Sequence, residues 1–406
     1  MKRKKILYIH QYFFHPKEPG PTRVYWISQE LINQGFEVTV ITQKNPNNPI
    51  HKIIRSVEKT KIDGINIIYI KNPYSMEFSK HRRLWAFFKF MIKSTWFALI
   101  EKETSLIIAS STPLSTGFPA IIAKKLKRIP FIFEVRDLWP EVPIQMGVLK
   151  NKLFIGLLRW FERLVYKNAS HIVALSPGMA EGPKSVVSEN KISIIPNMSK
   201  IDKFWPRTKN IDFGLSLDLS PNTFKIIHFG AMGDVNGLDN LVDAAALSIK
   251  KNIKNIDFIL IGGGKRKIHY QERKKSEKLF NLHILDRLPM NQISELVNLC
   301  DICYIGVSRF PILEINSANK FFDSLSAGKP LIINFGGWMQ EIIEKANCGI
   351  RVKPTDPEDL LEKILFLQKN QETRQKMGKN ARKIAEKEFD KSILCKNFAQ
   401  LVHKIS

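Results

Sequence analysis

Short apolar runs alternate with amphipathic stretches along this chain, and no other feature limits its possible folds as strongly. In the first half the apolar runs are ILYIHQYF, FEVTVIT and SLIIASS, and the stretch between the first two includes TRVYWISQELINQG. Continuous apolar runs are typical of parallel strands that are buried on both faces, and such strands need helical crossovers. The pattern therefore predicts an α/β fold in which helices cover both faces of doubly wound, mainly parallel sheets.

The alternation begins again after a polar stretch at residues 206–222, which indicates a second domain of the same kind. A chain of 406 residues is long enough for two such domains, since domains average roughly 150 residues. We predict one Rossmann-like domain over residues 1–205 and another over residues 206–385. Residues 386–406 are expected to form a helix that packs back on the N-terminal domain.

Basic residues outnumber acidic ones, because 63 Lys and Arg against 38 Asp and Glu leave a formal net charge of +25. Such a surface attracts polyanions or anionic lipid. The four cysteines lack the spacing of a disulfide framework, and the pair Cys300 and Cys303 has no further ligands at zinc spacing, so we interpret all four as reduced thiols. The start MKRKK is interpreted as the basic beginning of a strand, so the protein is expected to stay inside the cell.

Polar and glycine-rich loops follow several predicted strands, and doubly wound sheets bind ligands outside the carboxyl ends of their strands. The richest loops read HQYFFHPKEPGPTR, ASSTPLSTG, EVRDLWPE and HFGAMGDVNG. Known nucleotide motifs fail, because AGKP lacks the Ser or Thr of a phosphate-binding loop and GGGKRK is not G-x-G-x-x-G. No D-x-D follows an apolar strand either, so neither a dinucleotide cofactor nor a metal ion is expected.

The stretch SANKFFDSLSAGKPLIIN, residues 317–334, predicts a helix with clear ends. Ser317 is placed to cap the helix and Gly328 to take the left-handed position at its C-terminus. Lys320 and Asp323 then share one face. By itself this pair fits either a surface ion pair or a nucleotide site, in which Lys320 and the helix N-terminus hold a diphosphate and Asp323 binds the ribose hydroxyls.

This stretch resembles the donor-binding signature of the retaining family-four glycosyltransferases, which have the GT-B fold. That resemblance implies two Rossmann-like domains that face each other across a cleft, the first binding the acceptor and the second the nucleotide sugar. Asp323 stands where the family usually has Glu. The second acidic residue of the signature would fall on Ile315, and Glu314 lies one position away, where it is placed to reach the sugar hydroxyls.

Other loops resemble the same family, in particular its bacterial subgroup of N-acetylfucosamine-type transferases in O-antigen and capsule synthesis. The opening GPTRVYWISQELINQG resembles the first loop and helix, where a glycine lets backbone approach the donor phosphates, and FEVRDLWPE resembles the acceptor-domain motif. In HFGAMGDVNG, Ala231 and Asn236 replace the Arg and Lys that many members use for the diphosphate. Lys265 or Arg266 in the neighbouring loop is placed to supply the missing charge.

The resemblance implies retaining transfer of a sugar from a nucleotide-sugar donor to a lipid-linked or polysaccharide acceptor. It favours a UDP-linked donor, with an N-acetylated amino sugar as a candidate for the sugar. We expect the catalytic residues to be Asp137, Lys320 and Glu314. The residues expected to bind the nucleotide sugar are Gly20, Arg136, Gly230, Gly233, Lys265, Arg287, Leu288, Asn319 and Asp323. The nucleotide sugar is a co-substrate, so no separate cofactor is expected.

Two stretches in the first half are both basic and rich in aromatic residues. Residues 81–102 carry too many lysines to cross a bilayer and many aromatic rings, which predicts a helix lying at an anionic membrane surface. Residues 150–167 are interpreted as a sheet-covering helix with snorkelling lysines. The expected location is therefore the cytoplasm, with peripheral attachment to the inner face of the plasma membrane.

Two other functions remain open from the sequence. A sugar-nucleotide epimerase can share the fold, but it needs no interfacial aromatic helix. A nucleic-acid-binding protein would explain the positive charge, yet its aromatic side chains should line an exposed groove beside the basic ones. We therefore expect no nucleic-acid partner.

Overall fold

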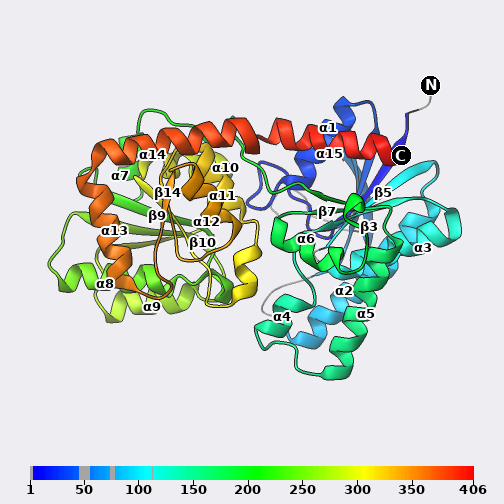
Figure 1. The fold of residues 1–406 in the computed structure, drawn as a ribbon, viewed down its shortest axis with the longest axis horizontal. Helices are drawn as coiled ribbons and strands as arrows, with labels where there is room; N and C mark the ends of the chain where they lie inside the picture. Colours follow the sequence, from blue (N-terminus) through cyan, green and yellow to red (C-terminus); the bar gives the residue numbers. More distant parts are fainter. Residues whose placement is uncertain (1–2, 45–54, 74–77, 112) are drawn as a thin grey trace. The chain divides into compact units, whose positions relative to one another are not determined.

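The alternation of strands and helices predicted from the apolar runs is present in both halves of the chain (Figure 1). The structure, a computed structural model, describes residues 3–44, 55–73, 78–111 and 113–406. The chain divides into two units: unit 1 contains Met1–Pro196 and Ser392–Ser406, and unit 2 contains Asn197–Lys391.

These boundaries differ from the predicted 205 and 386 because residues just before 206 and just after 385 also pack on unit 2. The backbone N–H of Asn197 donates to Ser317 Oγ at 3.1 Å, and Ser199 Oγ donates to the carbonyl of Phe322 at 2.9 Å. At the other end, the N–H of Ser199 donates to the carbonyl of Phe389 at 2.7 Å. Composition alone does not show which unit such a segment joins.

Within the described residues, unit 1 contains an eight-stranded sheet with the order β3-β4-β2-β1-β5-β6-β7-β8. All of its neighbouring strands pair in parallel except β3 and β4. The strands are β1 (Lys5–Ile9), β2 (Glu37–Gln43), β3 (Val57–Ile62), β4 (Ile65–Ile70), β5 (Thr104–Ser110), β6 (Phe131–Val135), β7 (His171–Ala174) and β8 (Ile192–Ile194). The helices are α1 (Arg23–Asn33), α2 (Lys80–Ile100), α3 (Gly117–Lys127), α4 (Glu141–Gln145), α5 (Lys152–Asn168), α6 (Pro177–Lys184) and α15 (Lys391–Ile405).

Unit 2 contains a six-stranded parallel sheet with the order β11-β10-β9-β12-β13-β14 in the described part of the chain. The strands are β9 (Phe224–Ala231), β10 (Ile256–Gly263), β11 (Leu282–Leu285), β12 (Ile302–Ile305), β13 (Leu331–Ile333) and β14 (Gly349–Arg351). The helices are α7 (Ile211–Leu215), α8 (Asp239–Lys250), α9 (Lys267–Ser276), α10 (Met290–Leu299), α11 (Asn319–Ser326), α12 (Trp338–Lys345), α13 (Pro357–Lys369) and α14 (Gln371–Ile384). Short helical turns η3 (Asp234–Asn236), η4 (Pro311–Ile315) and η5 (Ala385–Phe389) complete the unit.

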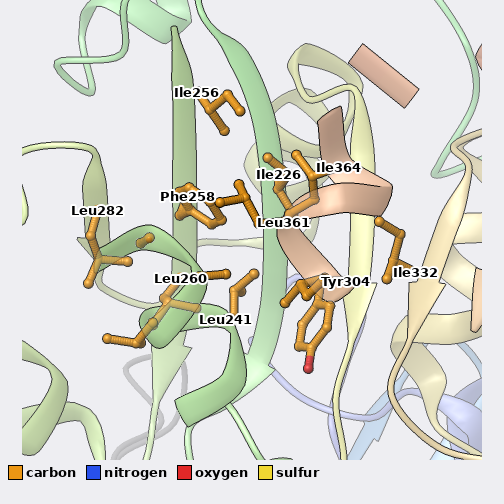
Figure 2. Close-up of a cluster of buried hydrophobic side chains, with 14 of the residues drawn as sticks. Ile226, Leu241, Ile256, Phe258, Leu260, Leu282, Tyr304, Ile332, Leu361 and Ile364 are labelled. Carbon is orange, nitrogen blue, oxygen red and sulfur yellow. The ribbon is translucent and has the colours of Figure 1, made fainter. Parts of the chain in front are cut away.

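The core of unit 2 joins strands and helices that are far apart in the sequence. Figure 2 shows Ile226, Phe258 and Tyr304 from three neighbouring strands together with Leu361 and Ile364 from α13. These side chains are almost completely buried. Burial of each large apolar side chain stabilises the folded state by roughly 1.5–3 kcal/mol. The tightly packed core therefore holds the ends of the strands in fixed positions.

All four cysteines are buried and free, as the sequence indicated. Burial raises the pKa of the Cys303 thiol to about 11 and that of the Cys300 thiol further still. These thiols are therefore protonated and inert near neutral pH.

Helix α2 divides its aromatic residues between the core and the solvent. The sequence assigned Trp85, Phe87, Phe88, Phe90, Trp96 and Phe97 together to a membrane surface. That assignment is wrong for Phe90 and Phe97, which are buried, because they follow the helical repeat of Ala86 and Ala98 on the sheet-facing side. The opposite face exposes a stripe of apolar side chains: Leu84, Trp85, Phe88, Ile92, Trp96 and Ile100. In the described residues, no helix has both the length and the apolar character needed to cross a membrane.

Helix α5 also exposes apolar side chains, which its interpretation as a sheet-covering helix did not predict. Val165 and Tyr166 at its C-terminal end are buried, as expected of a covering helix. Leu153 and Leu157 near its N-terminal end and Trp160 at its middle are 87%, 57% and 58% exposed.

Candidate functional site

Several of the predicted donor-binding residues lie near the point where the strand order of the unit 2 sheet reverses. Strand β9 is the first strand of this sheet, and the chain adds β10 and β11 on one side of it and β12 to β14 on the other. Ligands of open α/β sheets bind outside the carboxyl ends of the strands at such a switch point. Gly230 lies at the end of β9 and Gly233 in the loop that follows, and the segment after β12 leads to α11 with Lys320.

Lys320 extends from α11 to the end of β9. The Nζ atom of Lys320 lies 3.3 Å from Nε2 of His228. A Cβ added to Gly230 would lie 3.5 Å from Cε of Lys320. Gly230 has a φ of 127°, a backbone conformation that favours glycine. Removal from solvent lowers the pKa of the Lys320 ammonium to about 7. Lys320 therefore changes charge near neutral pH, although ordinary lysines do not.

His228 contacts this lysine from β9, and it was not among the residues predicted from the sequence. The ring is buried; its Nδ1 lies 3.3 Å from the carbonyl of Tyr304 and its Nε2 3.3 Å from that of Ala231. Burial, together with the charge of Lys320, lowers the pKa of His228 well below its ordinary value, so the imidazole is neutral. An ammonium can only donate, so Nε2 accepts from Lys320 and Nδ1–H donates to Tyr304. A histidine within an apolar strand was the sequence signal that could have identified this residue.

Helix α11 begins one residue later than predicted. Its N-terminal cap position is Ala318, and among the described residues no side chain caps it. Ser317, the predicted cap, instead accepts the backbone N–H of Asn197. The N–H of Phe321 donates to the carbonyl of Ala318 at 3.0 Å, which leaves the N–H groups of Asn319 and Lys320 at the start of the helix for an anion. The C-terminal end is as predicted, since Gly328 has a φ of 62°.

Asp323 lies on the same helix but forms a buried ion pair. Its Oδ1 lies 2.6 Å from Nζ of Lys200, and both side chains are at least nine-tenths buried. Burial raises the pKa of the Asp323 carboxyl, and the charge of Lys200 opposes that rise. A surface ion pair between Lys320 and Asp323, one of the two possibilities that the sequence left open, does not form. Asp323 pairs with Lys200 in the interior, whereas Lys320 contacts His228.

Glycines pack the turns after β9 and β10 tightly together. A Cβ on Gly262 would lie 1.8 Å from the carbonyl oxygen of Gly230, and a Cβ on Gly264 would lie 2.5 Å from that of Met232. Gly233 donates its backbone N–H to Asn236 Oδ1 at 3.1 Å, so Asn236 braces this turn. Only glycines allow these two backbones to approach so closely beside Lys320.

The next two loops bring further predicted residues to the same edge of the sheet. Lys265 follows β10, is 80% exposed and lies 3.3 Å from Asp234. Arg266, its alternative, pairs with Asp239 at 2.8 Å. Arg287 follows β11, and its Nε lies 2.9 Å from the position of a Cβ on Gly263, whereas Leu288 packs on the core.

Glu314 lies in η4 and faces the turn after β13. Its Oε2 is 3.1 Å from the position of a Cβ on Gly336, and its carbonyl is 2.9 Å from that of a Cβ on Gly337. Trp338 donates from Nε1 to the carbonyl of Asn316 at 2.8 Å, which fixes η4 against α12. Ile315, the position that the signature specifies, belongs to the same helical turn.

In unit 1, Arg136 and Asp137 follow β6, next to the switch point between β1 and β5. The guanidinium of Arg136 lies 3.2 Å from Nε2 of His10, and the backbone N–H of Arg136 donates to Ser111 Oγ at 2.8 Å. Burial and the charge of Arg136 lower the pKa of His10 to about 3, so this imidazole is neutral. The N–H of Asp137 donates to the same Ser111 hydroxyl at 3.4 Å. One serine thus shapes the turn that presents both residues.

A buried ion pair next to this turn was not predicted from the sequence. Arg23 Nε lies 2.7 Å from Glu134 Oε1, and both side chains are buried. Glu134 also accepts from Tyr8 at 3.1 Å and from Ser110 at 2.8 Å. Burial raises the pKa of the Glu134 carboxyl, but the positive charges of Arg23 and Arg136 and its hydrogen bonds lower it to about 2. A Glu within the apolar run FIFEV was the signal that could have shown it.

Gly20 precedes α1. Another side chain of the same loop occupies the space that a Cβ at this position would need. A Cβ at this position would lie 2.4 Å from the ring of Phe14.

Within the described residues, no cluster of three or more His, Cys, Asp or Glu side chains is arranged to hold a metal ion.

Two known families match the chain, one in each unit. Residues 20–198 match the glycosyl transferase 4-like domain, and residues 216–384 match the glycosyl transferases group 1. An uncharacterized glycosyltransferase of Methanocaldococcus jannaschii is 27% identical over 291 residues, which are 71% of this chain and 73% of that protein. The N,N'-diacetylbacillosaminyl-diphospho-undecaprenol alpha-1,3-N-acetylgalactosaminyltransferase of Campylobacter jejuni is 22% identical over 319 residues, 76% of this chain and 80% of that one.

Solved structures share the fold over nearly the whole chain. The sucrose-phosphate synthase of Thermosynechococcus elongatus superposes with a TM-score of 0.76 and 15% identity, covering 99% of both chains. The Anabaena protein HepE in complex with UDP and glucose superposes with a TM-score of 0.70 and 17% identity, covering 99% of this chain and 100% of that one. The fold is therefore GT-B, with two Rossmann-like units. The two family matches, over residues 20–198 and 216–384, show that the chain belongs to the group 1 glycosyltransferases and is an enzyme of the hexosyltransferase type.

Proposed function

We propose that this enzyme transfers a sugar from a UDP-linked donor, with retention of configuration, to a lipid-linked acceptor in cell-surface glycan synthesis. The observation that carries the proposal is the uncapped N-terminus of α11 with Lys320 beside Gly230 at the switch point of unit 2. A helix N-terminus and a lysine together favour a diphosphate. Two similar proteins support the finer assignment: HepE was crystallised with UDP and glucose, and the name of the Campylobacter enzyme specifies a diphospho-undecaprenol acceptor.

The donor's diphosphate would lie between α11 and the glycine turns. Lys320 and the N–H groups that begin at Asn319 would neutralise its charge, and Lys265 would add to this after leaving Asp234. Gly230 and Gly233 would let backbone approach the phosphates, and Gly20 would have the same role in its own loop. Asp323 would bind the ribose hydroxyls, and Glu314 the hydroxyls of the sugar.

The base of the nucleotide would lie over the loop after β11. Main-chain groups of Arg287 and Leu288 would contact its edge. The packing of Leu288 on the core holds this loop in place.

The acceptor hydroxyl would attack from the face that the diphosphate leaves, through an oxocarbenium-like transition state. In that reaction the bond from the sugar carbon to the diphosphate oxygen breaks, the bond to the acceptor oxygen forms, and the hydroxyl proton passes to the leaving diphosphate. Catalysis would then come mainly from positioning and from stabilising the charge on the leaving group by Lys320. Asp137 would orient the acceptor hydroxyl, and Arg136 beside it would bind an anionic group.

Helix α2 would attach the enzyme to the inner face of the plasma membrane. Its exposed stripe includes Trp85 and Trp96, which are 61% and 63% exposed, and the helix contains several basic residues and no acidic one. Aromatic rings with flanking basic groups favour the headgroup region of an anionic bilayer. A lipid-linked acceptor would be found at that surface.

A transfer assay tests the proposal. The enzyme is incubated with radiolabelled UDP-sugars and a bacterial lipid extract, and the label is followed into the organic phase. We expect label in lipid for at least one UDP-sugar and much less label with Lys320→Ala. Release of an epimerised nucleotide sugar, with no label in any glycan or lipid, would instead identify an epimerase.

A further inference from the structure

The exposed leucines and tryptophan of α5 form a second apolar stripe in unit 1. Leu153, Leu157 and Trp160 are spaced by four and three residues, so they lie on one face of the helix. Their exposure is unusual, because soluble proteins rarely leave several large apolar side chains together in water. Lys152, Arg163 and Lys167 on the same helix are exposed as well, whereas Arg159 pairs with Glu141 at 2.8 Å.

This stripe belongs to the same helical layer as the stripe of α2. The crossovers from β4 through α2 to β5, from β5 through α3 to β6, and from β6 through α5 to β7 all advance in one direction along the sheet. Because such crossovers are right-handed, the three helices cover one face. Helix α3 contacts both α2 and α5, which Figure 1 draws on the same side of the sheet, and a Cβ on Gly117 of α3 would lie 2.6 Å from Val165 of α5.

Both stripes start at the rim that carries the proposed acceptor loop. The C-terminal ends of α2 and α5 lead within a few residues into the starts of β5 and β7, so both helices run antiparallel to the strands and their N-terminal ends point toward the rim of Arg136 and Asp137. The exposed residues Leu84, Trp85 and Leu153 all lie in the first two turns of their helices.

We infer that α2 and α5 together form a two-helix surface that docks on an anionic bilayer and holds the acceptor rim of unit 1 at the level of the lipid headgroups. The inference rests on the proposed lipid-linked acceptor. Charge complementarity selects the bilayer as the occupant, because basic side chains flank both stripes and anionic lipids attract them. A second copy of this chain would instead bring two equally basic surfaces together.

Vesicle binding tests the surface with matched variants. The α5 variant carries Leu153→Ser, Leu157→Ser and Trp160→Ser, and the α2 variant carries Trp85→Ser, Phe88→Ser and Trp96→Ser. The control variant carries Ile268→Ser and Phe280→Ser, which replace unit 2 residues that are 67% and 63% exposed. Cosedimentation uses vesicles of phosphatidylcholine with and without phosphatidylglycerol.

We expect the α5 and α2 variants each to bind the anionic vesicles roughly tenfold or more weakly than wild type, and the control to bind normally. A further variant, Leu126→Ser, removes a residue that is 69% exposed at the far end of α3 and should also bind normally. Calorimetry with UDP and the thermal unfolding midpoint show whether each variant is folded, and these side chains are exposed enough for substitution to leave the fold intact.

The outcomes separate the inference from the proposed function. Normal vesicle binding by the α5 variant, with loss in the α2 variant, would overturn the two-helix surface and leave attachment through α2 standing. Normal binding by both variants would remove the membrane contact altogether. If the α5 variant changes a dimer to a monomer in sedimentation velocity and still binds vesicles, the stripe contacts a second copy instead.

Discussion

Lys320 Nζ and His228 Nε2 lie 3.3 Å apart, so a neutral, buried imidazole from β9 accepts a hydrogen bond from the lysine in the first turn of α11. The two residues are 92 positions apart in the sequence. Their contact joins β9 to α11, the helix that follows β12. It therefore places a cation at the switch point, where strands β9 and β12 end.

The affinity for a UDP-sugar should fall as the pH rises above neutral. In the enzyme without ligand, the pKa of Lys320 is lowered from 10.5 to about 7, and a bound diphosphate favours the charged form and raises that pKa again. Below pH 7 the group is already protonated, so it adds no pH dependence. Above pH 7, Lys320 must take up a proton when the UDP-sugar binds. The affinity should therefore fall by up to about tenfold per pH unit until the pH reaches the pKa of Lys320 in the complex. Calorimetry from pH 6 to 9 measures this, and Lys320→Met should remove the trend. His228 does not contribute, because burial lowers its pKa well below the ordinary value.

Replacing His228 by Leu should weaken UDP-sugar binding through Lys320. Loss of one hydrogen-bond acceptor for the ammonium costs about 0.5–1.5 kcal/mol, or a factor of roughly 2–12 in affinity. The substitution should have no further effect in a Lys320→Met background. An equal loss in both backgrounds would show that His228 acts through the packing of β9 and not through the lysine.

Lys200→Met should destabilise unit 2 by about 3–5 kcal/mol, because it leaves the buried Asp323 carboxylate without its counter-charge. The double variant Lys200→Met and Asp323→Leu should recover most of that free energy of unfolding. Urea denaturation checks both. For the same reason, Asp323→Ala would not test ribose binding cleanly, since it leaves Lys200 buried and unpaired. Nucleotide affinity is better compared between Lys200→Met and the double variant, where only the carboxylate differs at the ribose site.

Arg23→Met should destabilise unit 1 by about 3–5 kcal/mol, because Glu134 then loses its ion-pair partner in the core. The pKa of Glu134 is lowered from 4.5 to about 2, so the stability that its carboxylate contributes is present above about pH 4.5. That stability should be lost as the pH falls through about 2. Glu134→Gln should flatten this part of the profile of unfolding free energy against pH. An acid profile unchanged by Glu134→Gln would contradict the ion pair.

The fold could be predicted because local patterns determine it. Apolar runs of strand length, spaced by amphipathic stretches, specify parallel strands and their crossovers. The end of α11 at Gly328 follows from the left-handed backbone that glycine adopts there. The loops of the donor site were found for a similar reason, since the carboxyl ends of parallel strands always meet at one edge.

Tertiary structure decided the partners of the charged residues and the faces of the helices. Lys320 contacts His228, Asp323 pairs with Lys200, and Arg23 pairs with Glu134 across 111 positions of sequence. These contacts depend on which strands become neighbours, and no local pattern specifies that order. The same holds for α2 and α5, whose rings are core or surface according to what packs beneath them. Periodicity defines a helix face, but only the assembled layer determines whether water or another helix covers it.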